Sequence, residues 1–345
     1  MRILFVGGTG LISSAVSPLL VERGHHLTLI NRGESAKASA PAGAEVIHAD
    51  ARDAESLRAA LRGKKLRGER YDAVVQWIGF DADHVAQDLE TFKGLTDQYV
   101  FISSASAYQT PPPHLPIGED TPLSNPHWAY SRAKAECERL IEASGVPYTI
   151  VRPSHTYGYP DVPMAITSWA KPWTIVDRIK RGGKIIMHGD GASLWTLTDH
   201  RDFAVGIAGL LGNPDALGEA VNITGDDVLS WNQIHAIVAG AVGVSEEQLA
   251  AQTVNIPSAL LARFDSEAFE GPLMGDKTSS GIFDHSKVSR LVPEFATRHR
   301  FADSIHESIA WFEADESRRG IDADANALWD DVIARYERGV DAMFA

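Results

Sequence analysis

Cysteine is nearly absent from this chain, which carries a single one, Cys137, among its 345 residues. An internal disulfide and a cysteine-ligated zinc site are therefore excluded, and one thiol suits a reducing compartment. No stretch approaches the roughly 18 uncharged apolar residues that a membrane-spanning helix needs. The apolar run that opens the chain is too short for a signal peptide. We therefore expect a cytoplasmic protein that does not bind membranes.

An excess of positive charge is also missing. The chain has 32 Lys and Arg against 46 Asp and Glu, a formal net charge of −14. Nucleic acids and anionic membranes are bound by basic surfaces, so we expect neither as the main partner. No metal-binding or nucleotide-triphosphate motif is found, and no metal is expected. With nucleic acids and membranes excluded as main partners, we expect the partner to be a small-molecule substrate.

Short apolar runs alternate with helix-like stretches in the first half of the chain. This pattern predicts the α/β class, a Rossmann-type doubly wound parallel sheet covered by helices on both faces. The expected strands are Ile3–Val6, Leu27–Ile30, Val46–His48, Ala73–Gln76, Tyr99–Ile102 and Tyr148–Val151. The expected helices are Leu11–Arg23, Ala54–Leu61, Ala82–Leu95 and Ala129–Ser144.

The composition of the sequence changes after residue 152, where proline and tryptophan become more frequent. The strands expected there are short and scattered. We expect residues 1–152 to form a dinucleotide-binding Rossmann domain and residues 153–345 to form mainly a smaller α+β substrate lobe. The short strands Lys184–Met187 and Ala220–Ile223 are placed in this second part, although some segments are expected to return to the first sheet. The amphipathic stretch Ala325–Phe344 is expected to be a helix that packs on its own lobe.

A glycine-rich turn, Gly7-Gly8-Thr9-Gly10-Leu11-Ile12-Ser13, follows the first strand and opens the first helix. Glycine permits a tight turn and lets backbone amides approach a pyrophosphate, whose charge the helix N-terminus favours. The alternative is a purely structural turn, but the strand before and the helix after favour a dinucleotide site. Gly7, Gly10, Leu11 and Ile12 are the expected contacts. Ser13 replaces the third glycine, so helix and strand should be slightly further apart.

The end of the second strand indicates which dinucleotide is bound. An acidic residue there binds ribose hydroxyls, whereas an arginine accommodates a 2′-phosphate. This chain has Asn31 and Arg32, which favour NADP, with NAD possible. Arg32 could instead be a solvated turn residue. Asp50 and Ala51 follow the third strand and could border the adenine, but Asp50 could equally be a helix cap.

A tyrosine and a lysine four residues apart, Tyr130 and Lys134, lie at the start of a helical stretch. Residues at this spacing share a helix face, and an ammonium beside a phenol lowers the pKa of the phenol. The pair therefore predicts a general acid–base. Ser104 ends the preceding strand, where its hydroxyl could bind a substrate oxygen, although such serines are often only part of a polar loop.

Together these features resemble the extended short-chain dehydrogenase/reductase family, in its NAD(P)-dependent epimerase/dehydratase branch and its atypical members above all. The resemblance implies that Ser104 and Tyr130 are catalytic and that Lys134 holds the nicotinamide ribose. It also implies a hydride transfer at a carbinol carbon, usually of a nucleotide-linked sugar, and a possible homodimer. It rests on Gly7-Gly8-Thr9-Gly10, Ser103-Ser104, Tyr130/Lys134, Arg152-Pro153-Ser154-His155-Thr156-Tyr157-Gly158 and Gly189-Asp190-Gly191.

Departures from the family pattern refine these expectations. Family 4,6-dehydratases have Asp-Glu after the catalytic threonine, whereas this chain has Ala105-Ser106, so dehydration is disfavoured. Ser106 remains a candidate substrate contact, and so does His155, which could instead be structural. Trp195 stands where relatives place an arginine for a substrate diphosphate. Arg201 could compensate, or Trp195 could stack on a substrate ring or merely pack in the lobe.

The sequence therefore predicts an NAD(P)-dependent oxidoreductase or epimerase that acts on a hydroxyl or ketone of a sugar or nucleotide sugar. One alternative is an NADPH-consuming ketoreductase with a non-nucleotide substrate. A second alternative is a non-catalytic relative that binds a nucleotide or RNA.

Overall fold

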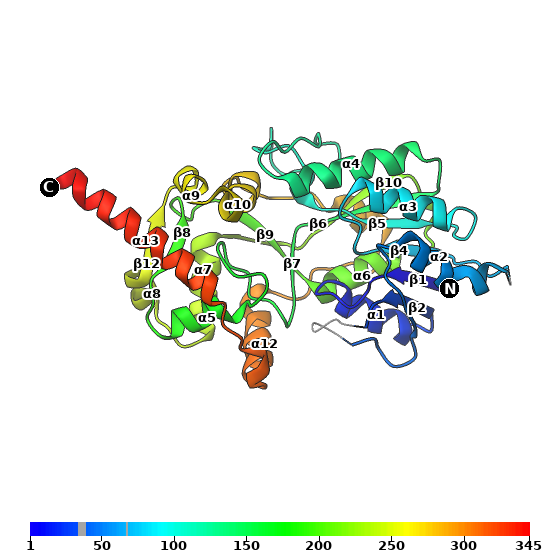
Figure 1. The fold of residues 1–345 in the computed structure, drawn as a ribbon, viewed down its shortest axis with the longest axis horizontal. Coiled ribbons are helices and arrows are strands. Elements are labelled where there is room, and N and C mark those ends of the chain that lie inside the picture. Colours follow the sequence, from blue (N-terminus) through cyan, green and yellow to red (C-terminus); the bar gives the residue numbers. More distant parts are fainter. Residues whose placement is uncertain (34–38, 67) are drawn as a thin grey trace.

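The computed structural model describes residues 1–33, 39–66 and 68–345, which form two lobes side by side (Figure 1). The N-terminus lies in the lobe built around the large sheet, and the C-terminus lies at the far end of the other lobe (Figure 1). We call them the sheet lobe and the second lobe. No helix of the described residues is both long and apolar enough to cross a membrane.

The sheet lobe is built on seven parallel strands in the order β10-β6-β5-β4-β1-β2-β3. Strands such as β1 and β4 are buried on both faces, which explains their continuous apolar sequences. The Rossmann-type parallel sheet expected from the sequence is thereby confirmed. The strands are β1 (Arg2–Val6), β2 (His26–Asn31), β3 (Glu45–His48), β4 (Ala73–Gln76), β5 (Tyr99–Ile102), β6 (Tyr148–Pro153) and β10 (Glu219–Ile223).

Helices cover both faces of this sheet. On one face, α1 and α6 pack against each other and bury residues such as Val16 and Phe203 on the strands. On the other face, α2, α3 and α4 bury residues such as Leu57, Val85 and Ile141. These helices are α1 (Ser13–Glu22), α2 (Ala54–Leu66), α3 (Ala82–Phe92), α4 (Ala129–Ala143), α6 (His200–Leu210) and α11 (Ser286–Leu291), with the short turns η1 (Ala105–Ala107) and η2 (Pro214–Ala216).

The strand expected at Ala220–Ile223 lies in the large sheet as β10, where Val221 pairs with Val151 of β6. Its position in the sequence suggested the second lobe, but its fully buried inner residues are those of a sheet strand covered on both sides. The chain thus enters the second lobe after β6, returns for α6 and β10, leaves again, and returns once more for α11 before α12 and α13.

The second lobe combines two small sheets with helices around a core that includes Trp231 and Trp329. Its strands are β7 (His155–Tyr157), β8 (Ile185–His188), β9 (Leu194–Asp199), β11 (Asp227–Ser230) and β12 (Thr253–Ile256). Its helices are α5 (Trp173–Lys180), α7 (Trp231–Ala241), α8 (Glu246–Gln252), α9 (Ser258–Phe264), α10 (Ser266–Phe269), α12 (Phe301–Glu313) and α13 (Ala323–Phe344), with the π-helix η3 (Glu270–Lys277) and the short turn η4 (Glu316–Arg318).

The last helix, α13, packs on its own lobe through Trp329, Val332 and Ile333, as expected from its apolar stripe. Its final turn projects from the lobe (Figure 1), and Phe344 is 88% exposed.

Candidate functional site

The glycine-rich turn adopts a backbone conformation that other residues rarely allow. Gly7 and Gly8 have φ angles of 95° and 98°, and a Cβ on Gly8 would lie 2.9 Å from side-chain atoms of Phe5 and Leu29. The helix α1 begins only at Ser13, two residues later than expected. The Ser13 hydroxyl accepts a hydrogen bond from the Gly10 amide at 2.9 Å, so it closes the turn where a third glycine was missing.

Two cavities lie on either side of this turn. The first, of about 330 Å³, is lined by Gly7 and by the ends of β2 and β3, and it contains four candidates for the adenosine end of a dinucleotide: Asn31, Arg32, Asp50 and Ala51. Asp50 accepts a hydrogen bond from the Arg52 amide at 3.0 Å, while the first turn of α2 is capped by Asp53 instead.

The second cavity, of about 350 Å³, lies between the two lobes and is called the catalytic pocket below. Leu11 and Ile12 of the turn line it together with Ser104, Ser106 and Tyr130. A flexible glycine turn with a cavity on each side fits an extended dinucleotide whose pyrophosphate crosses the turn. The residues present therefore fit NAD(P), with the nicotinamide end in the catalytic pocket.

Tyr130 is the second residue of α4, and it is half-buried. Burial raises the pKa of Tyr130 most, and the nearby Asp276 carboxylate raises it further, while a hydrogen bond with Ser104 acts in the opposite direction. The sequence had predicted that Lys134 lowers this pKa. The structure does not show this lowering: the pKa of Tyr130 is raised, and Lys134 is not among the groups that shift it.

Lys134 is 2% exposed and does not line either cavity. Its ammonium donates hydrogen bonds to the carbonyl oxygens of Gly79 at 2.7 Å and Ile102 at 2.8 Å, and it lies 5.7 Å from the centre of the Tyr130 ring. Burial lowers the pKa of Lys134 to about 8. The lysine thus ties α4 to the ends of β4 and β5, beneath the tyrosine.

A chain of three hydroxyl groups begins at Ser104, which lines the pocket together with Tyr130. Ser104 contacts Ser106 at 2.9 Å between their Oγ atoms, and the Ser131 hydroxyl donates to Ser106 at 2.8 Å. Ser104 also caps the short helix η1. These contacts fix the position of the Ser104 hydroxyl in the pocket.

His155 and Trp195 both line the catalytic pocket from the second lobe. The His155 Nε2 atom lies 3.7 Å from the Asp161 carboxylate, and the histidine ring stacks 6.3 Å from the Trp169 ring. Trp195 is 5% exposed and packs 5.8 Å from the Trp231 ring, so it contributes to the lobe core as well as to the pocket.

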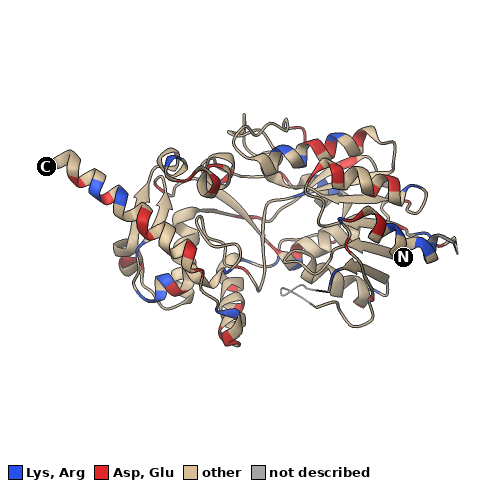
Figure 2. Cartoon of the chain, viewed as in Figure 1, with Lys and Arg blue, Asp and Glu red and all other residues tan. Residues whose placement is uncertain are grey.

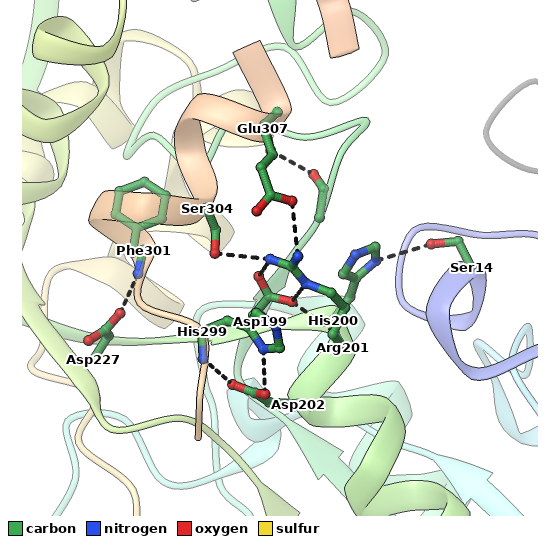
Figure 3. Close-up of polar contacts among 12 residues, drawn as sticks. Ser14, Asp199, His200, Arg201, Asp202, Asp227, His299, Phe301, Ser304 and Glu307 are labelled. Carbon is green, nitrogen blue, oxygen red and sulfur yellow. Dashed lines mark hydrogen bonds and ion pairs between the residues drawn. The ribbon is translucent and has the colours of Figure 1, made fainter. Parts of the chain in front are cut away.

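Arg201 does not reach the catalytic pocket, which corrects its assignment as a substrate contact. Its guanidinium is directed at Asp199, Ser304 and Glu307 (Figure 3), at 2.8 to 3.2 Å. Asp199 caps α6 through the Arg201 amide, so this segment is a capped helix start. Arg201 and His200 line a different cavity, of about 680 Å³, between α1, α6 and α12.

Sequence reasoning missed several residues of the catalytic pocket. Asp161 comes from the loop after β7, Asp276 and Lys277 come from the π-helix η3, and Trp128 and Trp169 provide aromatic walls. None of them belongs to a motif. The one available signal was that Asp161 follows closely after the segment Arg152–Gly158.

Comparisons with known proteins agree with this geometry. Residues 7–173 match the family of NAD(P)H-binding domains. The chain is 28% identical, over 262 residues and 72% of its length, to the chloroplast stem-loop binding protein of 41 kDa b of Arabidopsis thaliana, and it spans 65% of that relative. It is 25% identical over 308 residues to 2′-dehydrokanamycin reductase of Streptomyces kanamyceticus, which covers 86% of this chain and 81% of the relative.

Among solved structures, UDP-glucose 4-epimerase of Bifidobacterium longum in complex with NAD+ and UDP superposes with a TM-score of 0.70 at 16% identity. The superposition covers 92% of this chain and 100% of the epimerase. The chain therefore carries an NAD(P)H-binding domain and has the fold of the extended short-chain dehydrogenase/reductases, the NAD-dependent epimerase/dehydratase family.

Proposed function

We propose that this protein is an NAD(P)-dependent oxidoreductase that transfers hydride at a hydroxyl-bearing or keto carbon of a sugar-like substrate. The observation that carries the proposal is that Ser104 and Tyr130 line one pocket, which Leu11 and Ile12 of the glycine-rich turn also line. Bound NAD(P) would supply or accept the hydride. The 4-epimerase reaction and the ketoreductase reaction both use this arrangement.

The raised pKa of Tyr130 suits a role as the proton donor in the reduction of a ketone. A buried phenol stays protonated at neutral pH, so Tyr130 is ready to donate its proton to the oxygen of a ketone as the carbon is reduced. Ser104 is placed to donate a second hydrogen bond to the same oxygen. The 2′-dehydrokanamycin reductase named among the relatives supports a reductase.

Dehydration is disfavoured because Ala105 and Ser106, the residues after Ser104, provide no carboxylate. The relative named as a stem-loop binding protein raises nucleic-acid binding as a second candidate. The charge of this chain opposes it: the net charge is −14, and basic residues of the described chain are scattered among acidic ones (Figure 2).

Replacing Tyr130 by phenylalanine tests the proposal. NADPH oxidation is followed spectrophotometrically with a panel of keto-sugars and keto-substituted glycosides, and the Tyr130→Phe variant should lower kcat about 10²- to 10⁴-fold because the proton donor is lost. Tyr159→Phe, an exposed tyrosine outside the catalytic pocket, is the matched control and should leave kcat unchanged. Net NADPH consumption excludes a pure epimerase.

The pH dependence gives a second readout of the same role. Because the pKa of Tyr130 is raised, ketone reduction should be level through neutral pH and fall only in strongly alkaline solution, while the reverse oxidation should rise with pH. Equal turnover by Tyr130→Phe and by the unmodified protein contradicts the proposal. Absence of turnover on every substrate, together with stem-loop RNA binding, favours the second candidate.

We also propose NADP as the preferred cofactor, since Arg32 lines the adenosine-side cavity and suits a 2′-phosphate. The same assay run with NADH decides the question. A value of kcat/KM about tenfold higher with NADPH is expected from one charge-assisted contact. An equal or higher value with NADH would refute this preference.

A further inference from the structure

The second lobe contributes three charged side chains to the lining of the catalytic pocket, those of Asp161, Asp276 and Lys277. Asp276 and Lys277 are adjacent in the π-helix η3, with the Lys277 Nζ atom 3.6 Å from the Asp276 carboxylate. Burial raises the pKa of Asp276 and lowers the pKa of Lys277, while the opposite charge of each partner acts against these shifts. As an ion pair, the two groups add no net charge to the pocket.

Asp161 is the third charged group, and it is incompletely bonded. It is 6% exposed, yet its Oδ2 atom has no hydrogen-bond partner among the described residues. The His155 Nε2 atom lies 3.7 Å away, which is longer than a direct hydrogen bond. An unpaired buried carboxylate oxygen is costly, so a donor that arrives with a ligand would be bound favourably there.

The walls around this carboxylate are aromatic. Trp128, Trp169 and Trp195 all line the pocket, and the buried Nε1 atom of Trp195 also lacks a hydrogen-bond partner in the described part of the chain. Aromatic faces attract cations through their quadrupole, and a carboxylate attracts them through its charge. The combination is suited to an ammonium group with hydroxyl neighbours, since an adjacent hydroxyl could accept the Trp195 N–H.

Cationic side chains are scarce at the same place. Among the described residues that line the catalytic pocket and the adjoining cavity of about 310 Å³, Lys277 is the one Lys or Arg, and Asp276 lies beside it. Arg201, the residue that could have bound a diphosphate, is held in ion pairs elsewhere. A diphosphate placed here would meet the Asp161 carboxylate without an unengaged cation to balance its charge.

We propose that the Asp161 end of the catalytic pocket binds a protonated amino group on the substrate ring, and that the substrate carries no nucleoside diphosphate. This inference rests on the proposed function, because it names the class of sugar-like substrate that the same pocket takes. Asp161 acts as the specificity residue, and Tyr130 acts on a carbon elsewhere on the ring.

Competition binding by saturation-transfer NMR tests the proposal on the full chain loaded with NADP+. The probes are D-glucosamine, D-glucose and N-acetyl-D-glucosamine, which differ at one carbon, and UDP-glucose. We expect D-glucosamine to bind about tenfold more tightly than D-glucose, as one charge-assisted hydrogen bond provides, with the other two probes no tighter than D-glucose.

The Asp161→Asn variant keeps the shape of the side chain and removes its charge, so the preference for D-glucosamine should fall to about twofold or less. Asp341→Asn, on the exposed last part of α13, is the matched control and should keep the full preference. Equal binding of D-glucosamine and D-glucose by the unmodified protein overturns the proposal. So does D-glucosamine binding too weak to detect, tighter binding of UDP-glucose, or an undiminished preference in Asp161→Asn.

This experiment separates the inference from the proposed function. A protein that prefers D-glucosamine but shows neither net NADPH oxidation nor epimerisation would leave the recognition site standing and refute the hydride transfer. A protein that reduces a UDP-linked keto-sugar through Tyr130 would leave the hydride transfer standing and refute the amino-sugar site.

Discussion

Two buried carboxylates, Glu138 of the sheet lobe and Asp161 of the second lobe, differ in how completely they are hydrogen-bonded. In the sheet lobe, Arg152 of β6 makes three contacts of 2.6 to 3.2 Å with the fully buried Glu138 carboxylate, and it also donates to Tyr108. The Ser103 hydroxyl donates to the same carboxylate. In the second lobe, Asp161 keeps one buried oxygen without a hydrogen bond.

This difference separates charges that hold the fold from charges that are available to a ligand. A buried ion pair whose oxygens are all bonded stabilises one arrangement of its helices and strands, and removing one partner is costly. A buried carboxylate with an unbonded oxygen lowers the stability of the empty pocket and increases the affinity for a donor. The comparison predicts that replacing a residue of the fully bonded pair lowers stability strongly, whereas replacing an incompletely bonded carboxylate does not.

The largest effect is expected at Arg152. Replacing it by methionine leaves the Glu138 carboxylate buried without its cation, so the free energy of unfolding should fall by about 3 to 5 kcal/mol. Urea denaturation followed by circular dichroism measures this loss.

Arg181→Met is the matched control, since Arg181 forms an exposed ion pair with Asp177 that should be worth about 1 kcal/mol or less. If Arg152→Met does not fold, the double variant with Glu138→Gln should recover part of the stability, because the unpaired charge is gone. A loss no larger than that of the control would break the comparison.

A smaller effect is expected at Asp88, the exception within the sheet lobe. Gln76 and Tyr99 donate to its Oδ2 atom, but its Oδ1 atom is buried without a partner, and burial raises the pKa of Asp88 to about 7. The folded protein holds this proton more tightly than the unfolded chain, so stability falls as the pH rises from about 4 to 7.

Asp88→Asn removes the charge, so at pH 8 it should raise the free energy of unfolding by about 1 to 3 kcal/mol, less the cost of a new unpaired amide. The gain should shrink toward zero as the pH is lowered to about 4, where the unmodified carboxyl is protonated in both states. Urea denaturation at a series of pH values gives both numbers. A gain that does not depend on pH would show that the charge of Asp88 is not its origin.

The smallest effect on stability is expected at Asp161. Because its Oδ2 atom makes no hydrogen bond, Asp161→Asn should change the free energy of unfolding by less than about 1 kcal/mol while it alters ligand preference. The same denaturation experiment gives the value. A loss as large as that of Arg152→Met would mean that Asp161 holds the fold, and the distinction between the lobes would fail.

The sheet lobe could be predicted from the sequence because strands buried on both faces produce apolar runs, as in β1 and β4. Even there, the segment that forms β10 was expected in the second lobe, whereas it pairs with β6 in the large sheet. The sequence of a strand does not say which other strand it will pair with. The cofactor-side residues Asn31 and Arg32 were found through the turn that precedes them, and the structure gathers them around one cavity.

The second lobe could not be predicted in the same way. Asp276 and Lys277 come from a π-helix, a conformation without a sequence signature, and they meet Asp161 more than one hundred residues away in the chain. Arg201 was assigned to the substrate because it lies close in sequence to the expected site. In the structure its guanidinium forms ion pairs with Asp199 and Glu307 instead. The direction of the pKa shift of Tyr130 was not predicted correctly. The spacing of Tyr130 and Lys134 places the two residues on one helix face but does not say how deeply the phenol is buried.

The return of the chain to the sheet for α6 and β10 has a practical consequence. Neither lobe is one continuous stretch of polypeptide, so neither can be cut out by choosing two end points. A fragment that stops after residue 152 would lose β10, the strand beside β6, and α6, the helix that packs on α1. The edge of β6 would then be left without a hydrogen-bonded neighbour. The two lobes that line the pocket are therefore interleaved in the sequence. They have to be expressed together, and neither can be exchanged with a homologue as a single continuous segment.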